Sequence, residues 1–300
     1  MIQFIEFMNK RELLQKIRKE FPDLAWTKAE HNIDGQDHYV IILDDKYVFR
    51  FPRTAKYLKR LQNEILLLKY LKNKLNVPIP EYIYVAKDKS FAGYVLIPGF
   101  QLKKKVFRDL SDEVKQNLAK QIAGFLSELH KLPLKDLAGY GIEEPAIRVK
   151  YSVLKSKIYK YVIPRISKKD KILVDEYLED FKKYLKFPKE VFTHNDFYSS
   201  HILLDEKLEY FSGVIDFSDR KVGDPARDFC ELWDYGGEFV KEVYKNYTGP
   251  KDPDFIKRSS LYYNRIPFWE MISRFEGGRG SFKSGYRIFK FRFYKNKVEI

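Results

Sequence analysis

Histidine and aspartate residues lie close together in the segment from residue 191 to residue 217. His194 and Asp196 follow a short apolar stretch, and Asp216 ends an apolar run that is typical of a β-strand. Taken singly, Asp196 has the character of a turn residue, and His201 that of an ordinary partly buried histidine. A carboxylate at the end of an apolar strand is costly to bury, however, unless it has a charged partner or a metal. The combination therefore indicates a functional site.

The chemistry that this spacing allows is phosphoryl transfer. That reaction needs a carboxylate that orients and deprotonates the attacking hydroxyl, and ligands that hold Mg²⁺ on the phosphates of a nucleotide. A pattern H-x-D-x-x-x-x-N, followed after a hairpin by an aspartate, supplies these groups. Here Asp196 takes the position of the base, His201 the position usually held by asparagine, and Asp216 that of the second metal ligand. We predict Asp196 as the catalytic residue and His201 and Asp216 as ligands of Mg²⁺.

The same segment resembles the catalytic loop of the kinase-like small-molecule phosphotransferases, the superfamily of aminoglycoside phosphotransferases, choline kinases and macrolide kinases. The motifs that carry the resemblance are His194-Asn195-Asp196-Phe197, Ser200-His201-Ile202-Leu203, Ile215-Asp216-Phe217-Ser218-Asp219 and Gly223-Asp224-Pro225-Ala226-Arg227-Asp228-Phe229. They are most similar to the aminoglycoside 2''-phosphotransferase branch, which also carries histidine at the position of His201.

The resemblance implies an α+β protein with a two-lobed protein-kinase-like fold. A small antiparallel-sheet lobe over residues 1–97 would bind the nucleotide and end in the hinge. A larger, mostly helical lobe over residues 98–300 would carry catalysis and acceptor binding. Apolar patterns in the chain predict strands over 39–43, 47–51, 82–85 and 91–97, and helices over 10–21, 58–75, 112–131 and 266–275. The buried face of the second helix should comprise Leu61, Ile65, Leu68 and Leu71.

Four residues are assigned to the nucleotide by the resemblance. Arg50 and Glu64 occupy the positions of the strand lysine and helix glutamate that hold phosphates in kinase-like folds. For Glu64 the alternative is a solvated helix residue. Val95 and Ile97 lie in the expected hinge, whose backbone groups would bond the purine edge. Because backbone contacts leave little trace in side-chain identity, both ATP and GTP remain possible donors.

Three further residues are expected to be structural. His130 ends a helix that resembles the one packed under the catalytic loop throughout the superfamily. Asp224 and Asp228 belong to the loop that follows Asp216, and we expect them to fix it through hydrogen bonds.

The acceptor is a small hydroxylated molecule, for which we expect an aminoglycoside. A polycation would need a cluster of carboxylates, because half-buried ammonium groups need partners. The candidate acceptor-binding residues are Asp219, Glu231, Asp234 and Glu238, beside Asp196, together with Trp269 in the helix expected over 266–275. The alternatives are a kinase of another hydroxylated metabolite or antibiotic, and a nucleotide-binding pseudokinase.

The amino-acid composition indicates which classes of partner to expect. The chain has 56 lysines and arginines against 42 acidic residues, a net charge of +14. Such an excess could serve nucleic acid, but the basic residues are interspersed with acids as on a solvated surface, and no nucleic-acid-binding motif is present. We therefore expect no nucleic-acid partner, and a monomer. No apolar run approaches the roughly 18 residues that span a membrane, and the single Cys230 cannot form an intrachain disulfide, so we expect a cytoplasmic enzyme.

Overall fold

The computed structural model describes residues 8–33, 35, 37–142, 147–186 and 189–295. The chain divides into two compact units. Unit 1 comprises residues 1–102, 135–142 and 200–219, and unit 2 comprises residues 103–134, 143–199 and 220–300. A boundary near residue 97 between the nucleotide lobe and the catalytic lobe stays a prediction.

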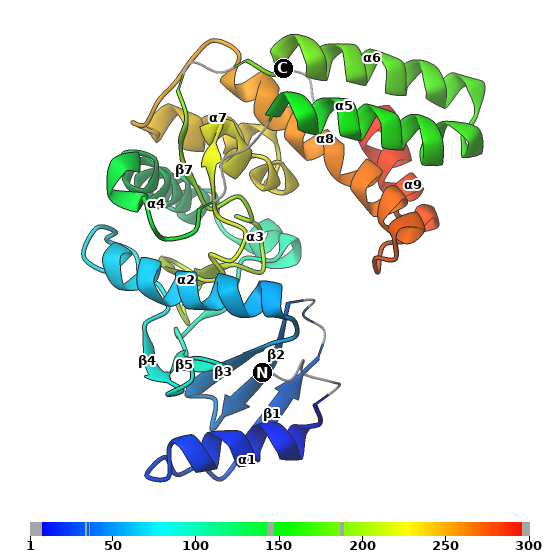
Figure 1. Cartoon of the computed structure of the whole chain (residues 1–300). Helices are drawn as coiled ribbons and strands as arrows, with labels where there is room; N and C mark the ends of the chain where they lie inside the picture. Colours follow the sequence, from blue (N-terminus) through cyan, green and yellow to red (C-terminus); the bar gives the residue numbers. More distant parts are fainter. Residues whose placement is uncertain (1–7, 34, 36, 143–146, 187–188, 296–300) are drawn as a thin grey trace. The chain divides into compact units, whose positions relative to one another are not determined.

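Unit 1 is built on a five-stranded antiparallel sheet (Figure 1). Its strands are β1 (Ala29–Asn32), β2 (His38–Leu43), β3 (Tyr47–Pro52), β4 (Tyr82–Val85) and β5 (Ala92–Val95), in the order β1-β2-β3-β5-β4. The hairpin between β2 and β3 turns at Asp44 and Asp45, which both have positive φ (50° and 52°). Two left-handed residues in succession make the tight turn whose twist matches that of paired strands. The strands expected from the sequence are confirmed.

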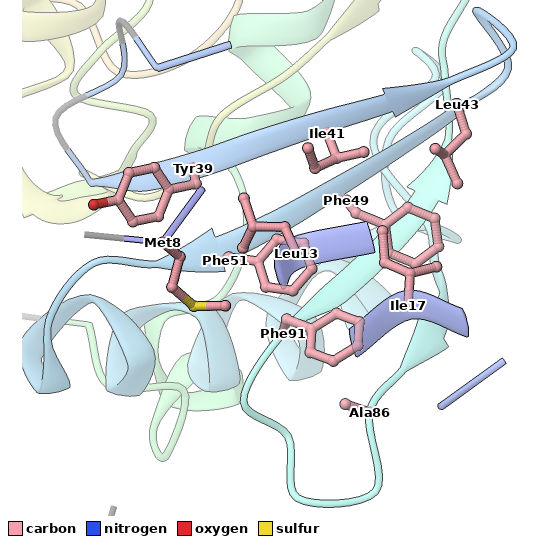
Figure 2. Packing of buried hydrophobic residues seen from close by; sticks show 10 residues of the cluster. All are labelled: Met8, Leu13, Ile17, Tyr39, Ile41, Leu43, Phe49, Phe51, Ala86 and Phe91. Atoms are coloured by element: carbon pink, nitrogen blue, oxygen red, sulfur yellow. The ribbon is translucent and has the colours of Figure 1, made fainter. Parts of the chain in front are cut away.

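The two faces of this sheet have different roles. Helix α1 (Lys10–Glu20) lies along one face and α2 (Ala55–Leu71) along the other (Figure 1). Side chains alternate along β3, so Phe49 and Phe51 join the apolar cluster under α1 that Figure 2 shows, with Leu13 and Ile17 from the helix. Arg50, between the two phenylalanines, therefore points to the α2 face.

Thr54 caps the N-terminus of helix α2, and its hydroxyl accepts the N–H of Tyr57. Its buried residues are Leu61, Glu64, Leu67, Leu68 and Leu71. The predicted face is confirmed except at Ile65, which is only half-buried, whereas its neighbour Glu64 is fully buried. A charge takes the inward position because Arg50 lies opposite it.

A second, small sheet completes unit 1. It consists of β6 (Phe100–Gln101), β8 (Ile202–Leu204) and β9 (Phe211–Val214), in the order β6-β8-β9 and antiparallel throughout. The last three residues of the short 3-10 turn η1 (Leu134–Leu137) also belong to unit 1.

Unit 2 is mostly helical. Its elements are α3 (Lys104–Asp109), α4 (Asp112–His130), α5 (Ile147–Lys157), η2 (Ile158–Val162), η3 (Ile163–Arg165), α6 (Lys168–Tyr184), β7 (Val191–Thr193), β10 (Lys221–Gly223), η4 (Pro225–Phe229), η5 (Glu231–Tyr235), α7 (Gly237–Asn246), α8 (Phe255–Ser273), η6 (Arg274–Glu276), α9 (Phe282–Lys290) and η7 (Phe291–Lys295). Helix α4 packs on α7 and α8 on α9 (Figure 1). The α+β class, with an antiparallel sheet followed by a mostly helical part, is confirmed.

The bounds of two helices in unit 2 can be compared with those predicted from the sequence. Helix α4 has the expected bounds within one residue, and Ser111 caps it by accepting the N–H of Val114. Helix α8 begins well before the predicted residue 266. Its first half carries Ser259 and Ser260, which interrupt the apolar pattern, yet their hydroxyls donate to the helix's own carbonyls and so fit inside it. Within the described residues, no helix is both long and apolar enough to cross a membrane.

Candidate active site

A buried ion pair lies on the α2 face of the sheet in unit 1. The Nη1 of Arg50 donates to Oε1 of Glu64 at 2.8 Å. The side chain of Glu64 is 0 % exposed, so the solvated alternative for this residue is wrong. A carboxylate with no access to water needs a cation in direct contact, and Arg50 provides it.

Three neutral side chains surround this pair. The hydroxyl of Tyr82 lies 3.1 Å from both Nη1 of Arg50 and Oε1 of Glu64. Ser218 accepts from Nη2 of Arg50 and donates to Oε2 of Glu64, both at 3.0 Å. The Nδ1 of His38 accepts from Nη2 of Arg50 at 3.2 Å. Burial, and then the charge of Arg50, hold the pKa of His38 well below its usual value, so His38 stays neutral and can accept.

Asp216 joins the same network. Its Oδ1 accepts from Nη2 of Arg50 at 3.2 Å and from the backbone N–H of Ser218 at 3.3 Å. Burial by itself would raise the pKa of Asp216, but the charges of Arg50 and then His201 lower the pKa far more. The carboxylate is therefore ionised, and with its side chain 35 % exposed it can still be reached by a ligand.

The hairpin of β8 and β9 brings His201 to Asp216. Ile202 pairs with Val214, and the next rung is closed by the N–H of Ile215, which donates to the carbonyl of His201 at 3.0 Å. Asp216 directly follows Ile215 and therefore lies one residue beyond the rung that contains His201. The Nε2 of His201 is 3.8 Å from Oδ2 of Asp216, and the oxygen facing His201 is the one that Arg50 does not bind.

These donors fit Mg²⁺ in part. Magnesium takes one or two protein carboxylates and completes its shell with water and phosphate oxygens, which suits the exposed Asp216. An imidazole nitrogen is the more usual ligand of a transition metal, so His201 is the weaker member of the pair. Within the described residues, no group of three or more His, Cys, Asp or Glu side chains could hold a metal by itself.

The remaining predicted residues of unit 1 lie elsewhere in it. Asp219 accepts from Nη1 of Arg60 at 3.0 Å, and this predicted acceptor-binding carboxylate therefore already has a cation. Val95 and Ile97 line a cavity of about 470 Å³ at the end of β5, which Pro78 and Ser212 also line.

In unit 2, a buried carboxylate fixes the loop that carries Asp196. Asp228 accepts the backbone N–H groups of His194 at 2.8 Å and Asn195 at 2.7 Å. Asn195 has a φ of 64°, a conformation that such anchoring can hold in place. Burial opposes ionisation of Asp228, but the hydrogen bond from His130 and the charges of His130 and His194 lower its pKa. The predicted structural role of Asp228 is confirmed by these contacts.

His130 supports this carboxylate from helix α4. Its Nε2 lies 3.0 Å from Oδ2 of Asp228, and its Nδ1 lies 2.7 Å from the hydroxyl of Tyr247. Phe197, next to Asp196, stacks on Phe125 of the same helix at 5.5 Å. Helix α4 thus holds the loop both by a hydrogen-bond chain and by ring packing, as expected of a structural His130.

The other predicted acceptor residues of unit 2 are partly engaged. Asp234 accepts from the hydroxyl of Tyr263 at 2.7 Å and pairs with Lys104 at 2.8 Å. Glu238 pairs with Lys241 at 3.0 Å. Burial, with the charge of Asp234 adding to it, raises the pKa of Glu231.

A cavity of about 970 Å³ collects two of these residues. Asp234 and Glu238 line it, among aromatic side chains that include Phe107 and Tyr235. Trp269 lies instead on α8, half-exposed, with Nζ of Lys157 5.5 Å from its ring centre. The structure therefore brings Asp234 and Glu238 to one cavity and leaves Trp269 outside its lining.

Several residues of these networks were not predicted from the sequence. They are His38, Tyr82 and Ser218 around Arg50, and Arg60 on Asp219. Only Ser218 lies in a motif that the sequence singled out, two positions after Asp216.

Comparison with known proteins decides the family. The model of a family described as "Phosphotransferase enzyme family" matches residues 28–255. The chain belongs to this family. The matched residues include the strand that carries Arg50, the loop that carries Asp196 and the hairpin that ends at Asp216. The resemblance predicted from the sequence is confirmed. The chain is thus a phosphotransferase of the family that phosphorylates alcohol groups, as predicted.

Relatives of known structure agree on the fold. The GDP complex of a mutant aminoglycoside 2'-phosphotransferase-IIIa superposes with a TM-score of 0.86 at 24% identity, over 94% of this chain and 96% of that one. A GDP and kanamycin complex of APH(2'')-IIIa gives 0.83 at 25% identity, over 94% and 98%.

Two further relatives are less similar in sequence. The macrolide 2'-phosphotransferase of Brachybacterium faecium, as the apoenzyme, gives a TM-score of 0.72 at 20% identity, over 94% of this chain and 98% of that one. The uncharacterized protein YcbJ of Bacillus subtilis (strain 168) is 22% identical over 247 residues, which are 74% of this chain and 76% of that protein.

Proposed function

We propose that the protein is a Mg²⁺-dependent small-molecule kinase that transfers the γ-phosphoryl group of ATP or GTP to a hydroxyl of its acceptor. The observation that carries the proposal is the position of Arg50, which bonds Glu64 on one side and Asp216 on the other. A buried cation held in this way is preorganised to meet phosphate charge, and preorganised charge is a large part of catalysis of phosphoryl transfer.

The nucleotide would be held by residues 1–97. Arg50, oriented by Glu64, would neutralise its phosphates, and the backbone of Val95 and Ile97 would bond the purine. Mg²⁺, when bound by Asp216 and His201, would supply charge neutralisation on the phosphate oxygens. GDP occupies three of the similar structures, and ATP or ADP occupies two others, which favours testing GTP beside ATP.

Asp196 would be the catalytic residue of the lobe predicted over residues 98–300. Its carboxylate would accept the proton of the acceptor hydroxyl, whose oxygen attacks the γ-phosphorus. Its own position depends on the backbone of His194 and Asn195, which Asp228 holds. The reaction would gain most from this positioning and less from the proton transfer itself.

The acceptor is a small hydroxylated molecule. The similar structures include enzymes of aminoglycosides and of macrolides, so an aminoglycoside is the first acceptor class to assay. The carboxylates proposed to hold its ammonium groups, Asp219, Asp234 and Glu238, already pair with cations of the chain, and an aminoglycoside would have to displace them. This observation favours the alternative, a different hydroxylated metabolite or antibiotic. A pseudokinase would keep the same fold without turnover.

The test is nucleotide consumption with purified protein. ATP and GTP turnover would be measured with and without Mg²⁺, and with aminoglycosides, macrolides and neutral sugars as acceptors. We expect acceptor-stimulated, Mg²⁺-dependent turnover that Asp196→Ala abolishes while nucleotide affinity stays within about threefold of wild type. Equal turnover by the wild type and by Asp196→Ala would overturn the assignment of Asp196.

A further inference from the structure

The cavity that Asp234 and Glu238 line lies wholly within unit 2. Its walls come from helix α3, the first turns of α4, the turn η5, and the elements α7, α8 and η7. The volume of about 970 Å³ lies within the range of about 300–1,000 Å³ that is usual for small-molecule sites. The chemistry of the lining therefore indicates which class of molecule the cavity can hold.

Three aromatic rings from three elements pack against one another in the lining. The ring centre of Phe107, on α3, lies 4.6 Å from that of Tyr235, at the end of η5, and 4.7 Å from that of Phe239, on α7. The rings of Tyr235 and Phe239 are 5.5 Å apart. Phe291 of η7 also lines the cavity, and it is 49 % exposed. A ligand with an apolar face would remove this aromatic surface from water, which favours binding.

The sheltered carboxylate of the cavity is poorly suited to an ammonium group. Asp234, whose side chain is 25 % exposed, accepts from the hydroxyl of Tyr263 at 2.7 Å and pairs with Nζ of Lys104 at 2.8 Å. The Nη2 of Arg292 lies 3.7 Å from the same oxygen. Two cations of the chain thus already surround one carboxylate. An ammonium group of a ligand would have to displace Lys104 and would still be repelled by Arg292.

The other three carboxylates in the lining have lysine partners on their own helices. Asp112, Glu238 and Glu242 form these pairs at 3.6, 3.0 and 3.5 Å. Asp112 and Glu238 are also well solvated, with side chains that are 95 % and 91 % exposed. Exposed charges of this kind bind a cation only weakly. The cavity therefore combines aromatic walls with carboxylates that the chain itself neutralises.

A short helical path connects this cavity to the loop that carries Asp196. Asp228 of η4 accepts two backbone N–H groups of that loop, and Asp234 follows Asp228 by six residues. Cys230, which joins η4 to η5, has φ −64° and ψ −40°, so the chain stays helical between the two turns. Because a 3-10 helix rises by about 2 Å per residue, the Cα atoms of Asp228 and Asp234 lie about 12 Å apart. A molecule of two or three rings can span this distance.

We propose that this cavity binds the acceptor through an apolar face, and that the acceptor is an uncharged hydroxyl compound with an aromatic or alicyclic ring system. This inference rests on the proposed function, since it specifies the acceptor class. The ring system would lie on Phe291 and on the packed rings of Phe107, Tyr235 and Phe239. The hydroxyl would extend along η5 toward Asp196. A polycation would find every described carboxylate of the lining already paired with a cation.

Binding can be measured without turnover. Methyl, phenyl and naphthyl β-glucosides share one sugar and differ in the apolar surface of the attached group. Each would be titrated calorimetrically into the full chain, with and without GDP. We expect the affinity to rise at least tenfold from the methyl to the naphthyl compound, because the larger group covers more of the aromatic wall. Equal affinities, or no binding of any of the three, would overturn the proposal.

Phe291→Ser tests whether the glucosides bind in this cavity. We expect its affinity for the naphthyl glucoside to fall at least fivefold, and Phe291→Trp, which keeps an aromatic ring, to bind like the wild type. Because the ring is half-exposed, the melting temperature of Phe291→Ser should change by less than about 2 °C. The matched control is Phe275→Ser, since Phe275 is 37 % exposed in the same unit and lies outside the lining. Naphthyl glucoside affinity equal in Phe291→Ser and the wild type would contradict the proposal.

Kanamycin serves as the polycationic comparison. We expect it to bind at least tenfold more weakly than the naphthyl glucoside. Tighter binding of kanamycin that Asp234→Asn weakens would instead identify a cation site and reject the apolar one. If Asp196→Ala leaves turnover unchanged, the proposed function fails, whereas the glucoside titrations still decide what the cavity binds. If Asp196→Ala abolishes turnover but the naphthyl and methyl glucosides bind equally, the proposed function stands and only the acceptor class is wrong.

Discussion

Arg50 and Asp216 are 166 residues apart in the chain, and they form an ion pair with Nη2 and Oδ1 at 3.2 Å. The strand β3 and the end of the β8–β9 hairpin are thereby joined at one charged contact within unit 1. Since Arg50 also bonds Glu64, its guanidinium holds two carboxylates whose mutual repulsion would otherwise oppose folding. The other oxygen of Asp216 faces His201.

Removal of the charge of Arg50 should destabilise the protein strongly. Arg50→Met leaves Glu64 buried without a cation, and breaking a buried pair in this way costs about 3–5 kcal/mol. The free energy of unfolding, measured in urea, should fall by that amount. The double variant Arg50→Met/Glu64→Leu, which removes both charges, should recover most of the loss. A double variant no more stable than Arg50→Met would show that the ion pair is not the cause.

We expect the hydroxyl of Ser218 to contribute to the stability of the folded protein. Ser218→Ala removes the hydroxyl that bridges Arg50 and Glu64, and a buried group left without its partner costs about 1–3 kcal/mol. We expect a loss of unfolding free energy in that range. Ser212→Ala is the matched control, because Ser212 donates to the carbonyl of Pro98 at an exposed site and should cost less than about 0.5 kcal/mol. Equal losses in the two variants would remove the special role of Ser218.

Asp228 should control the rate through the loop that carries Asp196. Asp228→Asn keeps the shape but replaces one of the two oxygens that accept the N–H groups of His194 and Asn195. Because a small misplacement of a catalytic group costs about a hundredfold, we expect kcat to fall roughly 10- to 100-fold with the KM for nucleotide little changed. Steady-state kinetics with a working acceptor measures both. A variant that folds and keeps its kcat would show that the loop holds its shape without Asp228.

Local patterns in the sequence predicted the groups that lie near each other in the chain. His201 and Asp216 are joined by a hairpin, so their adjacency follows from strand pairing, and the ends of α4 follow from Ser111 and the apolar spacing. Similarly, the structural roles of His130 and Asp228 followed from the family motifs.

Contacts across long sequence separations could not be predicted in this way. No sequence pattern around Arg50 indicates that Tyr82 and His38 are its partners. The helix α2 pattern failed at Ile65 for the same reason, since the inward position of Glu64 depends on a cation from another element. The cations that pair with Asp219 and Asp234 could not be predicted either, because the sequence gives the number of charges but not the distances between them.

The acid stability of the protein should depend on Asp170. This buried carboxylate of α6 accepts from Tyr286, Lys290 and Tyr294, which belong to the last helices of the chain. Burial alone would raise the pKa of Asp170, but the hydrogen bonds from Tyr286, Lys290 and the other donors lower it well below the ordinary value. A carboxylate that ionises more easily in the folded state stabilises that state above its unfolded pKa of about 3.9, and the stabilisation is lost as the pH falls below it.

Asp170→Asn should therefore lower the melting temperature most at neutral pH. The difference from the wild type should be constant between about pH 7 and pH 5 and should shrink as the pH falls below about 4, where the unfolded carboxylate takes up a proton and the folded one does not. Thermal unfolding followed by circular dichroism at pH 7, 5 and 3 measures this difference. The control is Glu176→Gln at an exposed position of the same helix, which should match the wild type at every pH. A gap that stays constant down to pH 3 would mean that the packing of Asp170, rather than its charge, anchors the last helices to α6.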